Sequence, residues 1–125
     1  MYPEELRYTL SHQWLRAEDR IVTIGLTDYL TSRLGYVRAV EFEPVGKRLK
    51  KKESFGKMET AKVVWDLESP LSGIIQEVNK TLLAKPRTIN NDPYGSGWLI
   101  KMKIRSLRQL DKLSSVKRYE KFAKR

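Results

Sequence analysis

Lys62 is the residue whose position along the chain most clearly suggests a chemical role. It closes a four-residue gap, 59–62, between two segments with apolar residues, 54–58 and 63–67. Two strand-like segments around a short gap predict a β-hairpin with Lys62 at its tip. A lysine at a hairpin tip is presented at one accessible place, as a modifying enzyme requires to select it among many lysines. A solvated turn lysine without a special role has the same pattern, so this feature alone leaves both interpretations open.

Catalysis by unaided side chains is difficult to build from this sequence. There are no cysteines, which excludes a disulfide framework, a cysteine nucleophile and a thiolate metal site. His12 is the only histidine, so a metal site with several histidines from one chain is excluded, and a serine-protease triad would depend on this one imidazole. No P-loop, dinucleotide-binding glycine motif or recognisable acid/base carboxylate pair is present. We therefore expect no catalysis by unaided side chains, and interpret His12 as structural.

Length and charge restrict the remaining classes. The 125 residues predict one domain, and no apolar run is long enough for a membrane span. The first twenty residues lack a basic start and an apolar core, so no secretory signal is predicted and a cytoplasmic location is expected. The net charge is +10, and the segment 101–125 holds ten Lys or Arg against two acids. A smaller basic cluster lies at 47–52. This distribution predicts an anionic partner surface, for which nucleic acid is one candidate.

The elements that must position Lys62 are mostly strands. Besides the hairpin, β-branched or alternating segments at 20–25, 36–42, 74–78 and 97–104 predict strands. Turns are predicted at 43–46 and 69–73, and a loop at 80–94. A short helix over 28–33 is predicted to be capped by Thr27 or Asp28 and ended by Gly35. In the last strand, alternation predicts burial of Trp98, Ile100, Met102 and Ile104 and exposure of Lys101 and Lys103.

The C-terminal segment has a helical pattern. Apolar residues recur at every third position, first at 107, 110 and 113 and then at 116, 119 and 122. This predicts one helix broken near Ser114-Ser115, or two short ones, within 106–124. Ser106 and Gln109 have the spacing of a capping box. We therefore expect a β domain over 1–104 and a basic helical segment over 105–125 packed on the same domain.

Several segments together resemble the H protein of the glycine cleavage system, a family of lipoyl carriers. The segment ETAKV at 59–63, preceded by FG at 55–56, is similar to the family's lipoylation motif, usually Glu-Ser-x-Lys-Ala. The other similar segments follow in order along nearly the whole chain: YTLSHQWL (8–15), VTIGLTDY (22–29), LG (34–35), Asp66, SPLSG (69–73), EVN (77–79), NNDPYG (90–95), GWLIK (97–101), Leu110 and YEKF (119–122).

The resemblance implies a fold, a cofactor and a site. The fold is mainly β, a lipoyl-domain-like sandwich or flattened barrel of two small antiparallel sheets with a short helix and C-terminal helices. Lipoate is expected to be attached covalently to Lys62, with Glu59 shaping the hairpin turn. The cleft that receives the lipoyl arm is expected to contain Ser11, Gln13, Arg33 and Asp66.

The resemblance also implies partners. The lipoyl arm accepts an aminomethyl group from glycine decarboxylase, gives it to the aminomethyltransferase and is reoxidised by lipoamide dehydrogenase. A lipoylating enzyme attaches the arm. The carrier itself has no turnover, does not bind a membrane, and is expected to be a monomer when it is not docked. The missing cysteines fit, because lipoate brings its own disulfide.

Departures from the family pattern support an alternative. Gln13 stands where the family typically has Glu, Arg33 where it commonly has His, and Tyr36 where it has an acid. All three changes move charge away from a cationic load. They favour an H-protein-like lipoate-binding protein that carries sulfur intermediates for a heterodisulfide-reductase-like oxidation system. An unlipoylated paralogue and a nucleic-acid-binding β protein are further alternatives. The last is disfavoured because aromatic and basic residues do not interleave on one face.

Overall fold

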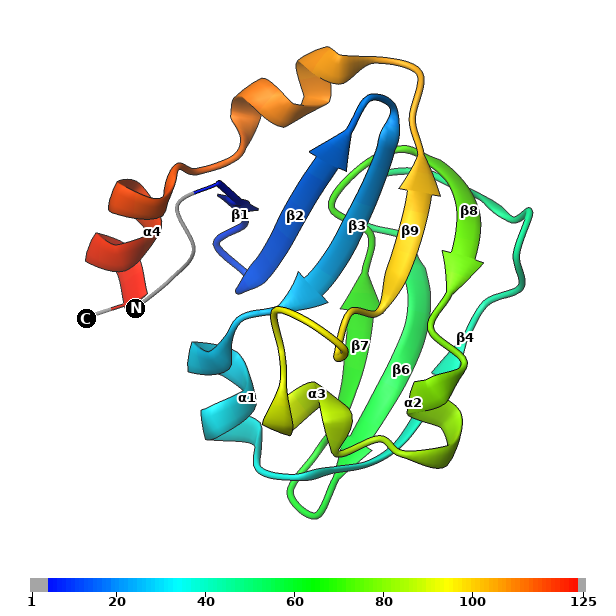
Figure 1. Ribbon diagram of the computed structural model, residues 1–125, viewed down its shortest axis with the longest axis vertical. Coiled ribbons are helices and arrows are strands. Elements are labelled where there is room, and N and C mark those ends of the chain that lie inside the picture. Colours follow the sequence, from blue (N-terminus) through cyan, green and yellow to red (C-terminus); the bar gives the residue numbers. More distant parts are fainter. Residues whose placement is uncertain (1–4, 124–125) are drawn as a thin grey trace.

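Two antiparallel sheets form the frame of the molecule (Figure 1). The computed structural model describes residues 5–123. One sheet has six strands in the order β1-β2-β3-β9-β8-β5, and the other has three in the order β4-β6-β7. This confirms the expected mainly β fold. The elements are β1 (Arg7–Tyr8), β2 (Gln13–Glu18), β3 (Ile21–Leu26), α1 (Asp28–Leu34), β4 (Val37–Phe42), β5 (Arg48–Leu49), β6 (Ser54–Thr60), β7 (Val64–Glu68), β8 (Gly73–Val78), α2 (Thr81–Ala84), α3 (Thr88–Asn91), β9 (Ile100–Lys103), the 3₁₀ helix η1 (Leu107–Lys112) and α4 (Val116–Ala123).

The main core lies between the sheets. Both contribute fully buried apolar side chains, among them Ile24 and Met102 from the larger sheet and Phe55, Met58 and Leu67 from the smaller. Burial of each such side chain contributes about 1.5–3 kcal/mol to stability. The strands of the hairpin that carries Lys62 are therefore anchored in a packed core.

A second, smaller core covers the outer face of the larger sheet. It contains Leu6, Tyr8, Trp14, Tyr119 and Ala123, so α4 is fastened over β1 and β2. The indole of Trp14 packs closely against Gly25, where a Cβ would be 2.3 Å from Trp14 Cε2. Glycine at 25 is therefore required by close packing.

The short helix α1 agrees with its sequence signals. Thr27 is the N-cap, and its Oγ1 accepts a hydrogen bond from the backbone N–H of Leu30. The helix ends at Gly35, whose φ of 85° suits glycine. Of the two predicted caps, Thr27 is the one observed.

The predicted last strand and the loop before it differ from the structure. Strand β9 begins only at Ile100, so Trp98 precedes it and is half-buried against the second core; Lys101 is also partly buried, because its side chain lies over Trp98. Within 80–94 the short helices α2 and α3 replace the predicted loop. Each is anchored by one buried side chain, Leu82 or Ile89, a signal too short to identify a helix from sequence.

The C-terminal segment divides at the predicted place. The 3₁₀ helix η1 ends before Ser114, whose backbone pairs with Tyr8 of β1, and α4 follows. The side chain of Ser106 makes no capping bond, so the predicted capping box is wrong. Gln109 is used elsewhere, because its amide bonds the backbone of Ser72. Within residues 5–123 no helix is long and apolar enough to cross a membrane.

Candidate functional site

Lys62 lies at the exposed tip of the β6–β7 hairpin. In Figure 1 this hairpin points to the lower end of the molecule. The turn is residues 61–63, between β6 and β7. Thr60, the last residue of β6, holds this turn in place. Thr60 is only 2% exposed, and its Oγ1 accepts hydrogen bonds from the backbone N–H groups of Lys62 (3.1 Å) and Val63 (3.3 Å). The backbone N–H of Thr60 also donates to the Val63 carbonyl at 2.9 Å. Lys62 is therefore exposed while its backbone is held in place.

Glu59 lies in strand β6, so its predicted place in the hairpin turn is wrong. It pairs with Val64 of β7 on one side and with Ala39 of β4 on the other. The strand continues through Thr60 because that β-branched residue is buried and pairs with β4. The carboxylate of Glu59 accepts two hydrogen bonds from the guanidinium of Arg38, at 3.0 and 2.7 Å. Both side chains are largely exposed, so this pair contributes little to stability.

A cavity of about 300 Å³ lies beside β7, and we call it the acidic cavity. It brings together Ser11, Gln13 and Asp66, three of the four residues expected in the cleft. The remaining lining residues are Val64, Trp65 and Glu68, and none of the lining residues is basic. The cavity therefore follows the strand that leads away from Lys62.

Gln13 joins the two sheets at the edge of this cavity. Its side chain is 5% exposed, and its Nε2 donates a 2.8 Å hydrogen bond to the backbone carbonyl of Glu68 in β7. A carboxylate at position 13 could not donate this bond when ionised. The amide therefore has a structural task that the sequence alone did not reveal.

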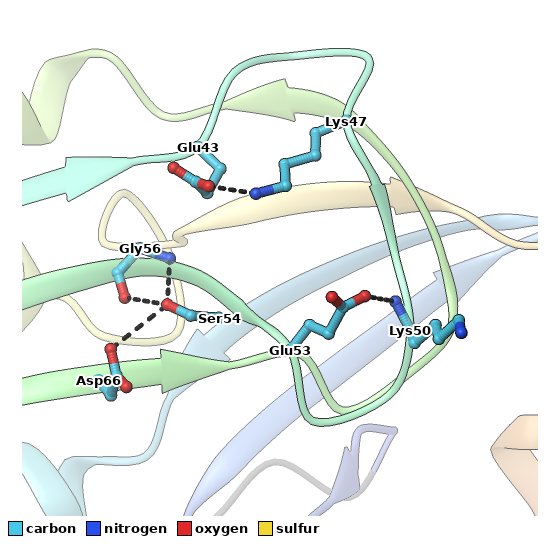
Figure 2. A network of polar contacts seen from close by, with 7 residues as sticks. All are labelled: Glu43, Lys47, Lys50, Glu53, Ser54, Gly56 and Asp66. Atoms are coloured by element: carbon cyan, nitrogen blue, oxygen red, sulfur yellow. Dashed lines mark hydrogen bonds and ion pairs between the residues drawn. The ribbon is translucent and has the colours of Figure 1, made fainter.

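Asp66 and Glu68 supply the negative charge of the cavity. Asp66 is exposed, and its Oδ1 accepts a 3.3 Å hydrogen bond from Ser54 Oγ on the neighbouring strand (Figure 2). Ser54 is itself fixed by bonds with the backbone N–H and carbonyl of Gly56. Sequence reasoning missed Glu68, although the alternation of β7 places 64, 66 and 68 on one face.

Arg33 does not line the acidic cavity, and its expected place in the cleft of the lipoyl arm stays a prediction. It is exposed on α1, and its guanidinium carbon lies 3.7 Å from the ring centre of Tyr29, one helical turn earlier. Its Nη1 also donates to the Tyr29 carbonyl at 3.4 Å. The spacing of four residues on a helix favours this local contact over a contact with β7.

His12 has a structural environment. Its Nδ1 lies 2.6 Å from the hydroxyl of Tyr119, which also bonds Thr27 Oγ1 at 2.7 Å, and its ring stacks on Tyr29 at 4.6 Å. Burial lowers the pKa of His12 below its ordinary value of 6.5, and the charge of Arg33 lowers it further. The imidazole therefore joins α4 to α1 as a neutral ring, as the structural interpretation expects.

A second cavity, of about 410 Å³, lies at the hairpin tip, and we call it the guanidinium cavity. Lys62 itself lines it together with Arg38, Arg87 and Tyr36. Tyr36 is 60% exposed, and the guanidinium carbon of Arg87 lies 4.1 Å from its ring centre. Sequence reasoning missed Arg87, because it lies in a segment predicted only as loop. Within residues 5–123 no cluster of three or more metal-ligating side chains is present.

Comparisons with known proteins agree with this geometry. Residues 6–125 match the family described as glycine cleavage H-protein. A glycine cleavage system H protein of Symbiobacterium thermophilum is 41% identical over 122 residues, which cover 98% of this chain and 95% of that protein. One from Bacteroides thetaiotaomicron is 45% identical over 102 residues, covering 82% and 81%. The crystal structure of a glycine cleavage system H protein from Mycobacterium marinum superposes with a TM-score of 0.87 at 32% identity, covering 96% and 97%. This chain belongs to the glycine cleavage H-protein family.

Membership of the H-protein family decides the class of the protein. H proteins are carriers and not enzymes, and they carry lipoate attached covalently to a lysine. The described residues suit such a group. The hairpin presents one exposed lysine on a fixed turn, and Lys62 makes no ion pair with any residue of 5–123. The guanidinium cavity at the tip and the acidic cavity along β7 offer space for an attached arm.

Proposed function

We propose that this H protein carries lipoate on Lys62 and conveys an aminomethyl group between glycine decarboxylase and the aminomethyltransferase, with reoxidation by lipoamide dehydrogenase. The observation that supports this best is the acidic cavity on the strand that follows Lys62. Asp66 is four residues beyond Lys62, a separation of roughly 13 Å along an extended strand. The cavity is therefore within reach of a lysine side chain lengthened by an acyl chain.

Each part of the hairpin has a task in this function. The lipoyl group supplies a disulfide that can be reduced, loaded and reoxidised by thiol–disulfide exchange. Lys62 Nζ is the nitrogen acylated by the lipoylating enzyme, and Thr60 holds the backbone around it in one conformation. Asp66 and Glu68 then provide carboxylates for a load that carries an ammonium. A charge-assisted hydrogen bond is about twice as strong as a neutral one.

The acidic cavity also makes the sulfur-carrier alternative less favoured than the sequence alone did. Arg33 lies outside this cavity, and Glu68 adds a carboxylate that the sequence comparison with the family did not count. The side-chain amide of Gln13 already donates a hydrogen bond to the backbone carbonyl of Glu68. The charge of the residues that line the acidic cavity is therefore negative and suits a cationic load, although the chain as a whole has a charge of +10.

One observation favours a second candidate function. The guanidinium cavity is lined by Arg38, Arg87 and Lys62, and it would suit an anionic sulfur load. Arg38 is already engaged by Glu59, and only Arg87 offers a guanidinium that is not in an ion pair within residues 5–123. We therefore place the sulfur carrier second.

The first test is attachment of lipoate. The chain is incubated with a lipoylating enzyme, lipoate and ATP, and intact mass and peptide mapping locate the adduct. We expect one lipoyl group, on Lys62, and none on the Lys62→Arg variant. Lys57→Arg is the matched control, because Lys57 is exposed on the same hairpin. An adduct on another lysine, or a normal carrier activity of Lys62→Arg, would contradict the assignment.

The second test separates the two loads. The lipoylated chain is offered glycine with the decarboxylase in one reaction and a sulfur donor in another. We expect loading from glycine, with a several-fold weaker yield for Asp66→Asn and an unchanged yield for Arg87→Gln. Loading only from the sulfur donor, with the loss moved to Arg87→Gln, would establish the second candidate instead.

A further inference from the structure

A third cavity, of about 530 Å³, lies at the opposite end of the molecule from Lys62, and we call it the far-end cavity. Its walls come from the β2–β3 turn, β5, the start of β8 and the segment that follows β9. In Figure 1 the β2–β3 turn and the end of β9 lie at the top of the molecule, and the β6–β7 tip lies at the bottom. This cavity therefore takes no part in the site around the lipoyl arm.

All charged residues that line the far-end cavity are positive. Five of its lining residues are cationic, Arg20, Arg48, Lys50, Lys103 and Arg105, and none is acidic. All five are exposed, and none forms an ion pair with another residue of 5–123. Like charges gathered around one concave surface repel each other, so an anionic group placed between them is strongly attracted.

The floor of the far-end cavity is apolar. Leu49 is 1% and Ile104 2% exposed, and Ile74 lies beside them partly buried. An apolar floor under a basic rim fits an occupant that has both an apolar and an anionic part. None of the lining residues is aromatic, so the surface has no platform on which nucleic-acid bases could stack.

Hydrogen bonds hold the walls in place. The side-chain amide of Gln109 forms two bonds with the backbone of Ser72, at 2.8 and 3.0 Å, and so fastens η1 beside the start of β8. The backbone N–H of Lys51 donates to Ser72 Oγ at 3.0 Å. Figure 2 shows how Glu53 accepts from the backbone N–H of Lys50 and fixes the turn after β5. A cavity held in this way needs little ordering when a ligand binds.

We propose that the far-end cavity is a docking site for an acidic segment of a partner protein, in which an apolar side chain enters the floor and carboxylates meet the basic rim. The cations are long exposed side chains from three separate segments, which fits an extended chain better than a small phosphate held by backbone N–H groups. A partner bound here leaves Lys62 free at the other end. The site therefore anchors the carrier to an assembly while the arm visits active sites, and does not depend on lipoylation.

The test is fluorescence anisotropy of the whole chain with a labelled peptide that has a single leucine between glutamates. We expect binding that weakens as salt rises, and that weakens further when the leucine is replaced by serine. The double variant Arg48→Glu/Lys103→Glu is expected to raise the dissociation constant at least tenfold. Lys117→Glu/Arg118→Glu makes the same change in net charge on α4, outside the cavity, and is expected to raise it less than twofold.

Three results would overturn the proposal. An equal loss in both double variants would show an effect of net charge without a site. Indifference to the leucine would remove the role of the floor. Tighter binding of a duplex DNA oligonucleotide, lost in the Arg48→Glu/Lys103→Glu variant, would assign the cavity to nucleic acid. If that variant does not fold, Arg105→Gln, which keeps the backbone and the buried floor, is expected to weaken peptide binding several-fold.

Discussion

The hydroxyl of Thr60 sets the conformation in which Lys62 is presented, and its removal is the sharpest test of the hairpin. Thr60→Val keeps the shape of the side chain and deletes the acceptor of the Lys62 and Val63 N–H bonds. Each bond contributes about 1 kcal/mol, so the variant should make opening of the tip easier by about 2 kcal/mol. This corresponds to about a thirty-fold larger open population.

Amide hydrogen exchange measures this opening directly. In Thr60→Val, exchange at the N–H groups of Lys62 and Val63 should be about thirty-fold faster, while Met58 in the paired part of β6 should keep its rate. The rate of lipoylation at low protein concentration should fall in the same variant, because fewer molecules present the lysine correctly. Thr60→Ser, which retains the hydroxyl, should behave like the unchanged protein.

Two results would refute this reasoning. Unchanged exchange at Lys62 in Thr60→Val would mean that the hydroxyl bonds do not hold the turn. Faster exchange with an unchanged rate of lipoylation would mean that the modifying enzyme does not depend on the conformation of the tip. In the second case the lysine would be recognised by its neighbours in sequence.

Two further variants test the second core and the site of the histidine. Gly25→Ala should destabilise the fold by about 1–3 kcal/mol, since its Cβ would overlap the buried indole of Trp14; an unchanged midpoint of urea unfolding would contradict this. The folded pKa of His12 is lowered by burial and by Arg33, so the unfolded chain binds more protons, and stability should fall as the pH decreases through 6.5. His12→Asn, which tolerates the φ of 69°, should lose this part of the pH dependence in unfolding at about pH 7.5 and 5.5, and an identical dependence in both proteins would contradict it.

The sequence predicted elements whose signals are local. The helix α1 could be placed because an N-cap threonine and a C-terminal glycine mark its two ends. The hairpin could be placed because apolar segments flank a short gap. Its exact turn could not, because strand β6 is extended by pairing with β4, a strand far away in sequence. Short helices such as α2 escaped prediction because one buried leucine is their main anchor.

Some residues of the candidate site could be predicted from the sequence, whereas the contacts of others could not. Lys62 was expected from the hairpin pattern and from the lipoylation motif, and Asp66 from the family resemblance alone. The contact of Arg33 with the ring of Tyr29 was not expected from the sequence and is seen only in the geometry of the helix. The hydrogen bonds between Gln109 and Ser72 join parts of the chain 37 residues apart. No local sequence pattern could show that Gln109 makes these bonds and not a capping box with Ser106.

The distribution of charge explains how one small carrier could satisfy two opposite requirements. The carboxylates of the acidic cavity lie on β7, which begins after Lys62 and ends before Ser72 of the far-end cavity, and none of the five cations of the far-end cavity belongs to that strand. The five residues of β7 alone span roughly 16 Å. This is about twice the distance over which charges are screened at physiological ionic strength. An acidic partner docked at the far end would therefore have little electrostatic effect at Lys62. The excess of positive charge and the negative cavity beside the arm are thus compatible within a single domain.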